Sequence, residues 1–87
     1  MKISLLQAKI LLRLEDWKEI NEIWKDLMAA GMQYHKQYIR QVLLDLEVLD
    51  IIEKIGGRGK KTTYRAKKKW LTIARKTIEN YVQNKKD

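Results

Sequence analysis

The chain has 87 residues, a formal net charge of +8 and an isoelectric point near 9.8. This length fits one domain, which buries roughly 60–65% of the surface of its unfolded chain. The sequence contains no cysteine, which excludes disulfides and thiolate metal sites. No apolar run approaches the roughly 20 residues of a membrane-spanning helix, so we expect no membrane contact.

Almost all of the excess charge lies in the C-terminal third. Residues 1–55 hold 8 Lys and Arg against 9 Asp and Glu, whereas residues 56–87 hold 11 against 2. Seven cations and no acid fall within residues 56–69. Clustered cations repel one another unless a partner neutralises them, and nucleic acid is the commonest partner of such a surface.

A first helix is predicted from about residue 5 to residue 14. Ser4 has a capping side chain, and Gln7 three residues later completes a capping box. Apolar side chains surround nearly the whole circumference of this helix. It must therefore be buried on several sides.

A second helix is predicted over about residues 17–30, and Gly31 ends it. Its start has two alternatives. Asp16 and Glu19 have the spacing of a capping box, whereas a cap at Asn21 would leave the first three residues of the range as a short extended link.

A third helix is predicted from about residue 34 to residue 49, after a turn of only a few residues. Its apolar stripe comprises Ile39, Val42, Leu43, Leu46 and Leu49. On a wheel of about 100° per residue, the opposite face carries Gln37, Arg40, Gln41 and Leu44.

The periodicity then changes from that of a helix to that of strands. Residues 51–55 and 62–66 are short and β-branched, and residues 56–61 between them hold the three remaining glycines, a pattern typical of a hairpin with a flexible loop. A last helix is predicted over about residues 68–83, with apolar side chains on roughly half of its circumference. The predicted fold class is therefore mainly α with a small β-hairpin (α+β).

Two segments of this arrangement resemble a known family. Residues 43–52, Leu-Leu-Asp-Leu-Glu-Val-Leu-Asp-Ile-Ile, resemble the end of the recognition helix and the first wing strand of winged helix-turn-helix proteins, and residues 56–65 resemble the wing. Asp50 stands where the family often has Gly. The resemblance is to small dimeric transcription regulators of prokaryotes, archaea or viruses. It implies a winged helix-turn-helix domain at 1–66, with a three-helix core and a two-stranded wing, and an appended amphipathic helix at 67–87.

The resemblance implies binding to double-stranded DNA, with the third helix in the major groove and the wing beside the minor groove. Side-chain chemistry supports the first role, because Gln can pair with adenine and Arg with guanine through two hydrogen bonds each. The predicted base-contacting residues are Gln37, Arg40 and Gln41. Tyr34 and Lys36, nearer the helix start, are predicted to contact the phosphate backbone. The alternative interpretation is an ordinary solvated helix face.

The wing offers a second set of cations. Arg58 lies between glycines and is predicted to enter a minor groove, while Lys60, Lys61 and Arg65 are predicted to contact phosphates. The alternative is a hairpin tip kept basic to block aggregation through its edges. Seven cations without an acid exceed that need.

Three further kinds of side chain have less specific predictions. Leu44 faces outward and would meet either a thymine methyl group or a minor packing or subunit contact. His35, the single histidine, is predicted to have a structural or capping role, with a phosphate contact as the alternative. Trp17, Trp24 and Trp70 are predicted to anchor the core or an interface.

No pattern predicts catalysis, a cofactor or a metal. The single histidine has no cysteine and no carboxylate pair at ligand spacing. The glycine loop fails the phosphate-loop pattern, because Gly59-Lys60 is followed by Lys61 and a strand. We therefore predict that the protein is not an enzyme, and we infer no small-molecule ligand. Residues 1–6 make a poor secretion signal, which favours the cytoplasm, in association with the nucleoid, or the host cytoplasm for a viral protein.

The last helix carries two apolar edges, of which one can close the core while the other meets a second copy of the chain. One edge comprises Trp70, Ile73, Thr77 and Tyr81, and the other comprises Leu71, Ile78 and Val82. We predict a homodimer through Trp70, Ile73, Thr77 and Tyr81. The leading function is a sequence-specific DNA-binding transcription regulator. The alternative is a winged-helix module for protein assembly or for non-specific binding of DNA or RNA. A membrane-surface helix is disfavoured, because polar residues dilute its basic face.

Overall fold

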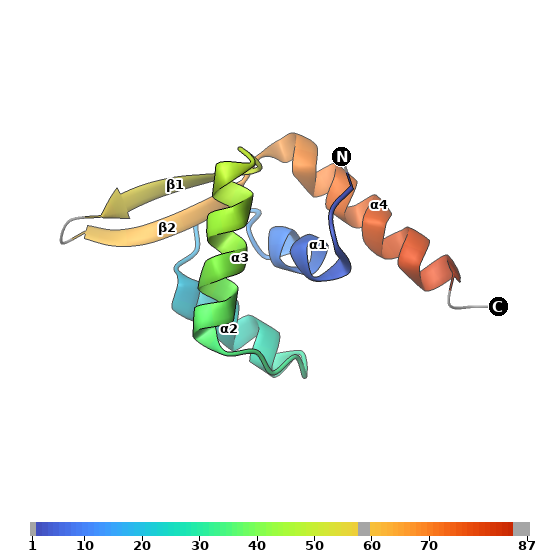
Figure 1. The fold of residues 1–87 in the computed structure, drawn as a ribbon, viewed down its shortest axis with the longest axis horizontal. Helices are drawn as coiled ribbons and strands as arrows, with labels where there is room; N and C mark the ends of the chain where they lie inside the picture. Colours follow the sequence, from blue (N-terminus) through green and yellow to red (C-terminus); the bar gives the residue numbers. More distant parts are fainter. Residues whose placement is uncertain (1, 58–59, 85–87) are drawn as a thin grey trace.

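The computed structural model describes residues 2–57 and 60–84 and places four helices around the base of one hairpin (Figure 1). The elements in chain order are α1 (Leu5–Leu12), α2 (Ile20–Ala29), α3 (Lys36–Val48), β1 (Ile52–Gly57), β2 (Lys60–Ala66) and α4 (Lys68–Asn84). The two strands are antiparallel neighbours. This order confirms the predicted α+β class.

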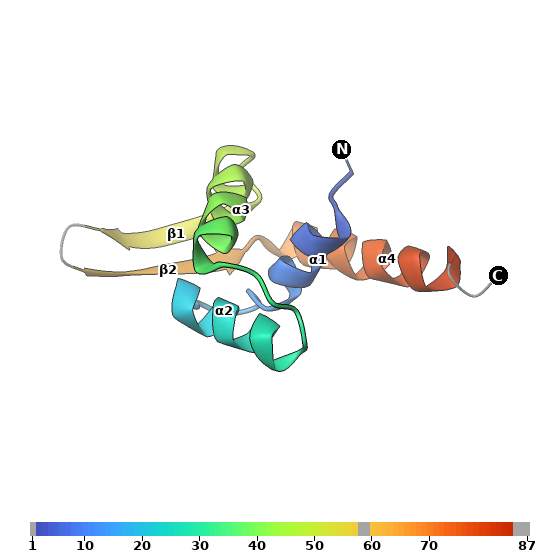
Figure 2. The ribbon, with the colours of Figure 1, turned by 60° about the horizontal axis from the view of Figure 1, so that its bottom comes forward.

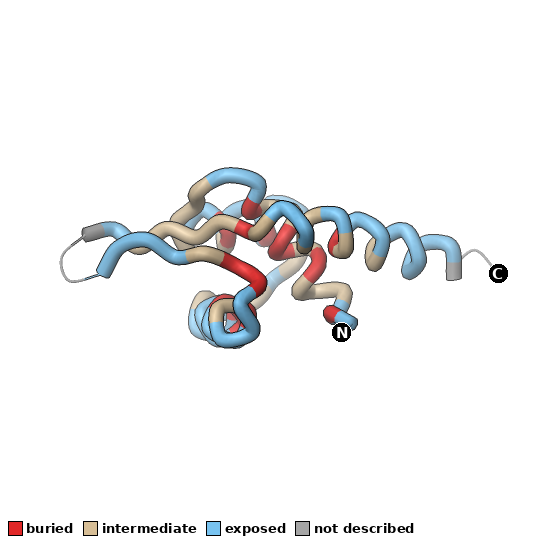
Figure 3. Tube along the Cα trace, turned by 90° about the horizontal axis from the view of Figure 1, so that it is seen from above, coloured by how far each residue is buried: buried red, intermediate tan, exposed pale blue. Residues whose placement is uncertain are grey.

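One apolar core joins α1, α2, α3, the hairpin base and the first half of α4. Its buried members are Ile3, Ala8, Ile10, Leu11, Leu14, Ile23, Leu27, Ile39, Val42, Leu43, Leu46, Ile51, Ile52, Ala66 and Ala74. Buried segments lie in the middle of the molecule, while the wing is a mixture of intermediate and exposed residues and the far end of α4 is exposed (Figure 3). The wing and α4 therefore project from opposite sides of the helical body (Figure 2).

The start of α1 follows the predicted capping box. The Gln7 backbone N–H donates to Ser4 Oγ over 3.1 Å, and the Ser4 N–H donates to Gln7 Oε1 over 2.8 Å. The helix ends at Leu12, two residues earlier than predicted, because Leu14 leaves the helical pattern to pair with the hairpin. The Leu14 carbonyl accepts a 2.8 Å hydrogen bond from the Ala66 N–H.

The start of α2 matches neither predicted cap, although residues 17–19 are extended as the second alternative predicted. The helix begins at Ile20 with Glu19 at the N-cap position, where the Glu22 carboxylate accepts from the Glu19 N–H over 3.2 Å. A tertiary contact fixes this boundary: Lys18 and Tyr64 exchange two backbone hydrogen bonds, 2.9 and 2.8 Å long. The chain before α2 is thus extended, because it lies against β2 as a single bridge.

The end of α3 contains the residue that departs from the family pattern. Asp50 has a φ of +62°, in the left-handed region that Gly adopts most easily. The N–H groups of Asp50 and Ile51 donate to the carbonyls of Glu47 and Leu46, both over 3.0 Å, which is a Schellman motif. Asp50 therefore reproduces the turn that Gly usually makes here, and Asp is among the residues that tolerate this conformation.

Replacing Asp50 by Val should lower the free energy of unfolding by about 1–2 kcal/mol, because a β-branched side chain is strained at positive φ. A domain of this size loses roughly 4–8 °C of Tm per kcal/mol. Asp50→Asn is the matched control, since Asn also tolerates this φ. It removes only the exposed ion pair with Lys67, worth at most about 1 kcal/mol. Equal thermal shifts in the two variants would contradict the backbone explanation.

The hairpin is longer than predicted, and its connection is correspondingly shorter. The pairs run from Ile52 with Ala66 to Gly57 with Lys60, and the register shifts between Ile55 and Gly57. Gly56, with a φ of +114°, stands opposite two residues of β2, Lys61 and Thr62, so the extra residue of this bulge lies on β2. A Cβ atom there would lie 2.3 Å from the Lys61 carbonyl oxygen. The strands thus continue into the glycine segment because a bulge opposite Gly56 lets them close again.

Gly56→Ala is expected to disrupt pairing in the outer half of the wing. Gly57→Ala is a matched control, because Gly57 has nearly the same φ, +115°, but open space around its Cβ position. Gly57→Ala should lower the local stability by about 1–2 kcal/mol, because Ala is strained at this φ. Gly56→Ala should lower it further, because its Cβ also approaches the Lys61 carbonyl oxygen. Amide hydrogen exchange of residues 54–64 measures both effects. Similar protection in the two variants would show that the close approach to Lys61 is unimportant.

Candidate nucleic-acid interface

The three predicted base-contacting residues are all exposed on the outward face of α3. Arg40 Nη1 lies 3.4 Å from Gln37 Oε1, a long hydrogen bond between exposed side chains. Gln41 Nε2 donates to Asp45 Oδ1 over 3.1 Å. The opposite face of the helix is in the core, so packing of the buried stripe holds the polar row outward. These amides and the guanidinium are therefore presented together on one rigid element.

A groove of about 550 Å³ connects α3 with the wing and the start of α2. Its lining residues are Glu19, Ile20, Asn21, Arg40, Lys61, Thr62 and Tyr64. Arg40 from the helix and Lys61 from β2 thus share one surface, as a combined helix-and-wing interface requires. The acid Glu19 lies in the same groove, with Oε1 3.7 Å from Lys61 Nζ. The place of Glu19 in this groove has no local sequence signal, because only the tertiary fold brings Glu19 to the wing.

Four cations in or beside the wing face acids of the same chain. The pairs are Lys54 with Glu47 (3.6 Å), Lys61 with Glu19 (3.7 Å), Arg65 with Glu53 (2.9 Å) and Lys67 with Asp50 (2.6 Å). All of these side chains are partly or largely exposed, and exposed pairs are worth only about 0–1 kcal/mol. A phosphate can therefore replace the acid at low cost.

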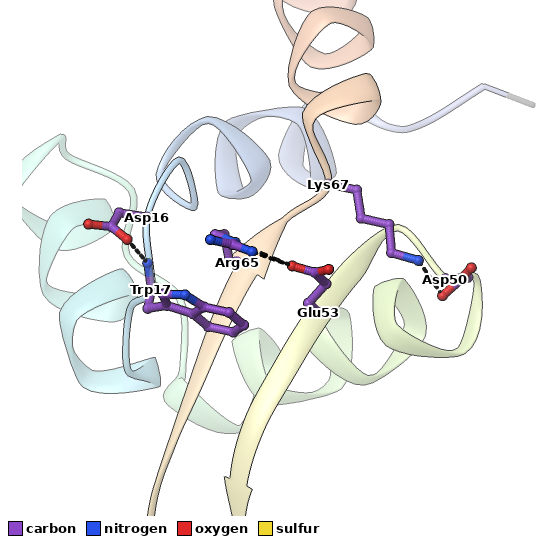
Figure 4. A network of polar contacts seen from close by, with 6 residues as sticks. All are labelled: Asp16, Trp17, Asp50, Glu53, Arg65 and Lys67. Carbon is purple, nitrogen blue, oxygen red and sulfur yellow. Dashed lines mark hydrogen bonds and ion pairs between the residues drawn. The ribbon is translucent and has the colours of Figure 1, made fainter.

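Arg65 is the most firmly held of these cations (Figure 4). Its Nε and Nη2 both donate to Glu53 Oε2, over 3.2 and 2.9 Å, and its guanidinium carbon lies 4.5 Å from the centroid of the Trp17 ring. Glu53 and Arg65 are cross-strand partners on the two strands. This contact ties the wing to the segment before α2, which is a structural role in addition to the predicted phosphate contact.

The residues at the start of α3 contact α2. Trp24 Nε1 donates to the Tyr34 carbonyl over 2.8 Å, and Lys36 Nζ lies 5.5 Å from the Trp24 ring centroid. His35 occupies the N-cap position of α3, in line with the predicted capping role, but its exposed side chain makes no capping hydrogen bond. Its backbone carbonyl instead accepts from the Tyr38 N–H over 3.0 Å. The short turn between α2 and α3 is thus fixed by Trp24.

Two further predictions fall outside the described part of the chain. Arg58 is among the residues that the structure leaves undescribed, as is the side chain of Lys60. Within residues 2–57 and 60–84, no group of three or more His, Asp or Glu residues is placed to hold a metal ion. None of the described helices is long and apolar enough to cross a membrane.

The predicted dimer residues lie along α4 at different depths. Trp70 and Ile73 pack against the core, and Thr77 is half-buried with its Oγ1 donating to the Ile73 carbonyl over 2.8 Å. Tyr81 is 41% exposed near the end of the helix. A groove of about 520 Å³ separates this edge from the N-terminal segment. Its lining residues are Lys2, Ile3, Leu5, Ile73, Lys76, Thr77, Asn80 and Tyr81.

A three-helix core followed by a two-stranded antiparallel hairpin is the winged helix-turn-helix fold, as the sequence predicted. Solved structures share it. A PadR-family transcriptional regulator from Eggerthella lenta DSM 2243 matches with a TM-score of 0.72 at 19% identity, over 87% of this chain and 70% of the regulator. A transcriptional regulator from Clostridium thermocellum matches with a TM-score of 0.72 at 21% identity, over 92% and 84%.

A third match is Lactococcus lactis ZitR, whose structure was solved as the wild type in complex with DNA. Its TM-score is 0.66 at 17% identity, covering 95% of this chain and 60% of ZitR. This chain therefore spans somewhat less than two thirds of the length of ZitR. No protein-family profile matches the sequence, and no curated protein matches it. At these identities the likeness establishes the winged-helix fold.

Proposed function

We propose that this chain is a sequence-specific double-stranded DNA-binding protein that regulates transcription. The observation that carries the proposal is the shared surface of α3 and β2, where Arg40 and Lys61 line one groove. Beside this groove, Gln37 and Gln41 are exposed on α3. Base-reading amides and phosphate-binding cations on adjoining rigid elements match the chemistry of a major groove and its flanking backbone.

In the proposed complex, α3 lies in the major groove and the wing lies beside the minor groove. Gln37, Arg40 and Gln41 contact base edges, Lys60 and Lys61 contact phosphates, and Arg58 enters the minor groove. Tyr34 and Lys36 contact the backbone near the start of α3, and Arg65 chiefly holds the wing in place. The ZitR structure with DNA supports DNA as the ligand class for this fold.

We further propose that residues 1–66 form the DNA-binding domain and that the helix at 67–87 joins two copies into a homodimer. Two copies would present two recognition helices to half-sites roughly 34–36 Å apart, one turn of DNA. No cofactor takes part, and the protein acts in the cytoplasm. The two-fold symmetry predicts a palindromic target.

A selection from random duplex DNA at two salt concentrations tests the function. Enrichment of a palindromic motif at both concentrations is the expected result, because base contacts confer a preference that salt does not remove. Binding that salt weakens and that enriches no motif would replace the proposal with non-specific nucleic-acid binding. Absence of binding to any duplex would favour a module for protein assembly.

A further inference from the structure

The outward face of α3 changes character along its length. Its first half presents Gln37 and Gln41, whereas its second half presents Leu44, 49% exposed, and Val48, 76% exposed. A single exposed apolar residue is common on protein surfaces. Here two exposed apolar residues are aligned with the proposed base-contacting amides, and this alignment indicates the chemistry of the surface that α3 binds.

The four side chains form one straight stripe. Positions 37, 41, 44 and 48 follow the i, i+4, i+7, i+11 spacing of one helix face. At about 100° per residue they fall within an arc of roughly 60°, and at about 1.5 Å per residue they extend over roughly 16 Å of the axis. A surface that approaches Gln37 and Gln41 along α3 would therefore also meet Leu44 and Val48.

The surroundings of the stripe favour a nucleic acid over a protein partner. Arg40 adjoins it on the helix, and Lys54 of β1 pairs with Glu47 beside its second half. Two apolar side chains among charges supply far less area than the roughly 1,200–2,000 Å² of a stable protein–protein interface. In the major groove, the C5-methyl group of thymine is the apolar feature that base edges present.

We propose that Leu44 and Val48 contact thymine methyl groups in the major groove, an inference that rests on the proposed DNA-binding function. The target half-site then has a polar and an apolar part in fixed order. Adenines lie opposite Gln37 and Gln41, and thymine methyl groups lie toward the C-terminal end of α3. The length of the stripe corresponds to about five base pairs at roughly 3.4 Å each.

Replacing thymine by uracil tests this contact directly, because it removes the methyl group and leaves base pairing unchanged. Affinity is measured for the selected duplex with uracil at each thymine position in turn. We expect a loss of roughly three- to fivefold at one or two positions, the size expected for one methyl group removed from an apolar contact. That loss should disappear in Leu44→Ala or Val48→Ala.

Two variants serve as controls. Leu49→Ala removes a similarly exposed side chain, 46% exposed, from the C-cap position just after α3. Because Leu49 lies off the stripe, this variant should keep the full uracil effect. Gln37→Ala should bind more weakly but also keep the uracil effect. Thermal unfolding verifies that each variant folds; Ala is a good helix former at positions 37, 44 and 48 within α3.

The outcomes separate this inference from the proposed function. A protein that selects a motif but is indifferent to uracil at every position overturns the methyl contact and leaves the regulator proposal standing. A uracil effect that persists in both Leu44→Ala and Val48→Ala overturns the assignment of these two residues. A protein that selects no motif overturns the proposed function, and the methyl contact with it.

Discussion

Arg40→Ala is expected to weaken binding to the preferred duplex by roughly 1–3 kcal/mol and to relax the preference at one base position. The physical reason is that a guanidinium paired with a guanine edge makes two hydrogen bonds that no other base reproduces. Arg40 is available for this role because its hydrogen bond to Gln37 is 3.4 Å long and joins two exposed side chains. The cost of leaving Gln37 for a base is therefore small.

The measurement is affinity for a panel of single-base variants of the selected site at several salt concentrations. Lys61→Ala is the informative companion, because Lys61 lines the same groove as Arg40 but is assigned to a phosphate. It should weaken all sequences alike and reduce the salt slope by about 1. If Arg40→Ala also lowered affinity uniformly, α3 would not be the reading element, and Arg40 would join Lys61 as a backbone contact.

Local chemistry made much of this fold predictable. The Ser4–Gln7 capping box needs only residues three apart. The apolar spacing of the third helix identified the buried residues Ile39, Val42, Leu43 and Leu46, but it was wrong for Leu49, which follows the last turn of α3 and is 46% exposed. The same periodicity predicted that Gln37, Arg40 and Gln41 are exposed. The residues on one face of a helix can be predicted from the sequence, because successive residues are rotated about the helix axis by a nearly constant angle.

The errors lie where distant segments decide a boundary. The start of α2 depends on the backbone bridge between Lys18 and Tyr64, residues that are far apart in the sequence. The outer hairpin depends on the β2 bulge opposite Gly56, after which Gly57 pairs with Lys60. Neither contact has a local sequence signal strong enough to outweigh a capping box or a glycine-rich loop.

The sequence also did not predict the acids that pair with the basic residues of the wing. A basic segment without nearby acids suggested uncompensated cations, but the fold brings Glu19 to Lys61 and Glu53 to Arg65. The Glu53–Arg65 pair follows from the strand register, which sequence alone did not fix. Acids of the same chain therefore pair with these two cations, and in the proposed complex a phosphate would compete with Glu19 for Lys61.

Thr77→Lys is expected to convert the proposed homodimer into a monomer. A two-fold interface contains each substitution twice, so one Lys per chain places two like charges near the symmetry axis. Thr77 is half-buried on the edge of α4 that adjoins the groove to the N-terminal segment. Lys is a better helix former than Thr, so helix propensity should not weaken α4.

Sedimentation measures the result directly. The wild type should have twice the 10.4 kDa chain mass, and Thr77→Lys should have the mass of one chain. Thr72→Lys is the matched control, because Thr72 is exposed on the same helix and lies in a different groove; it should remain dimeric. Val82→Lys tests the other apolar edge, where Val82 is 49% exposed.

Loss of the dimer should have a larger effect on DNA binding than loss of any single contact. Linking two half-site contacts raises affinity by roughly 10²–10⁴-fold through effective concentration, so Thr77→Lys should lose a factor of about 100 or more on the palindromic site. It should bind an isolated half-site as the wild type does, since α3 and the wing are unchanged. A wild-type mass near 10.4 kDa at high concentration would refute the dimer. If Val82→Lys alone produced monomers, the interface would lie on the other edge of α4, and Val82 rather than Thr77 would face the two-fold axis.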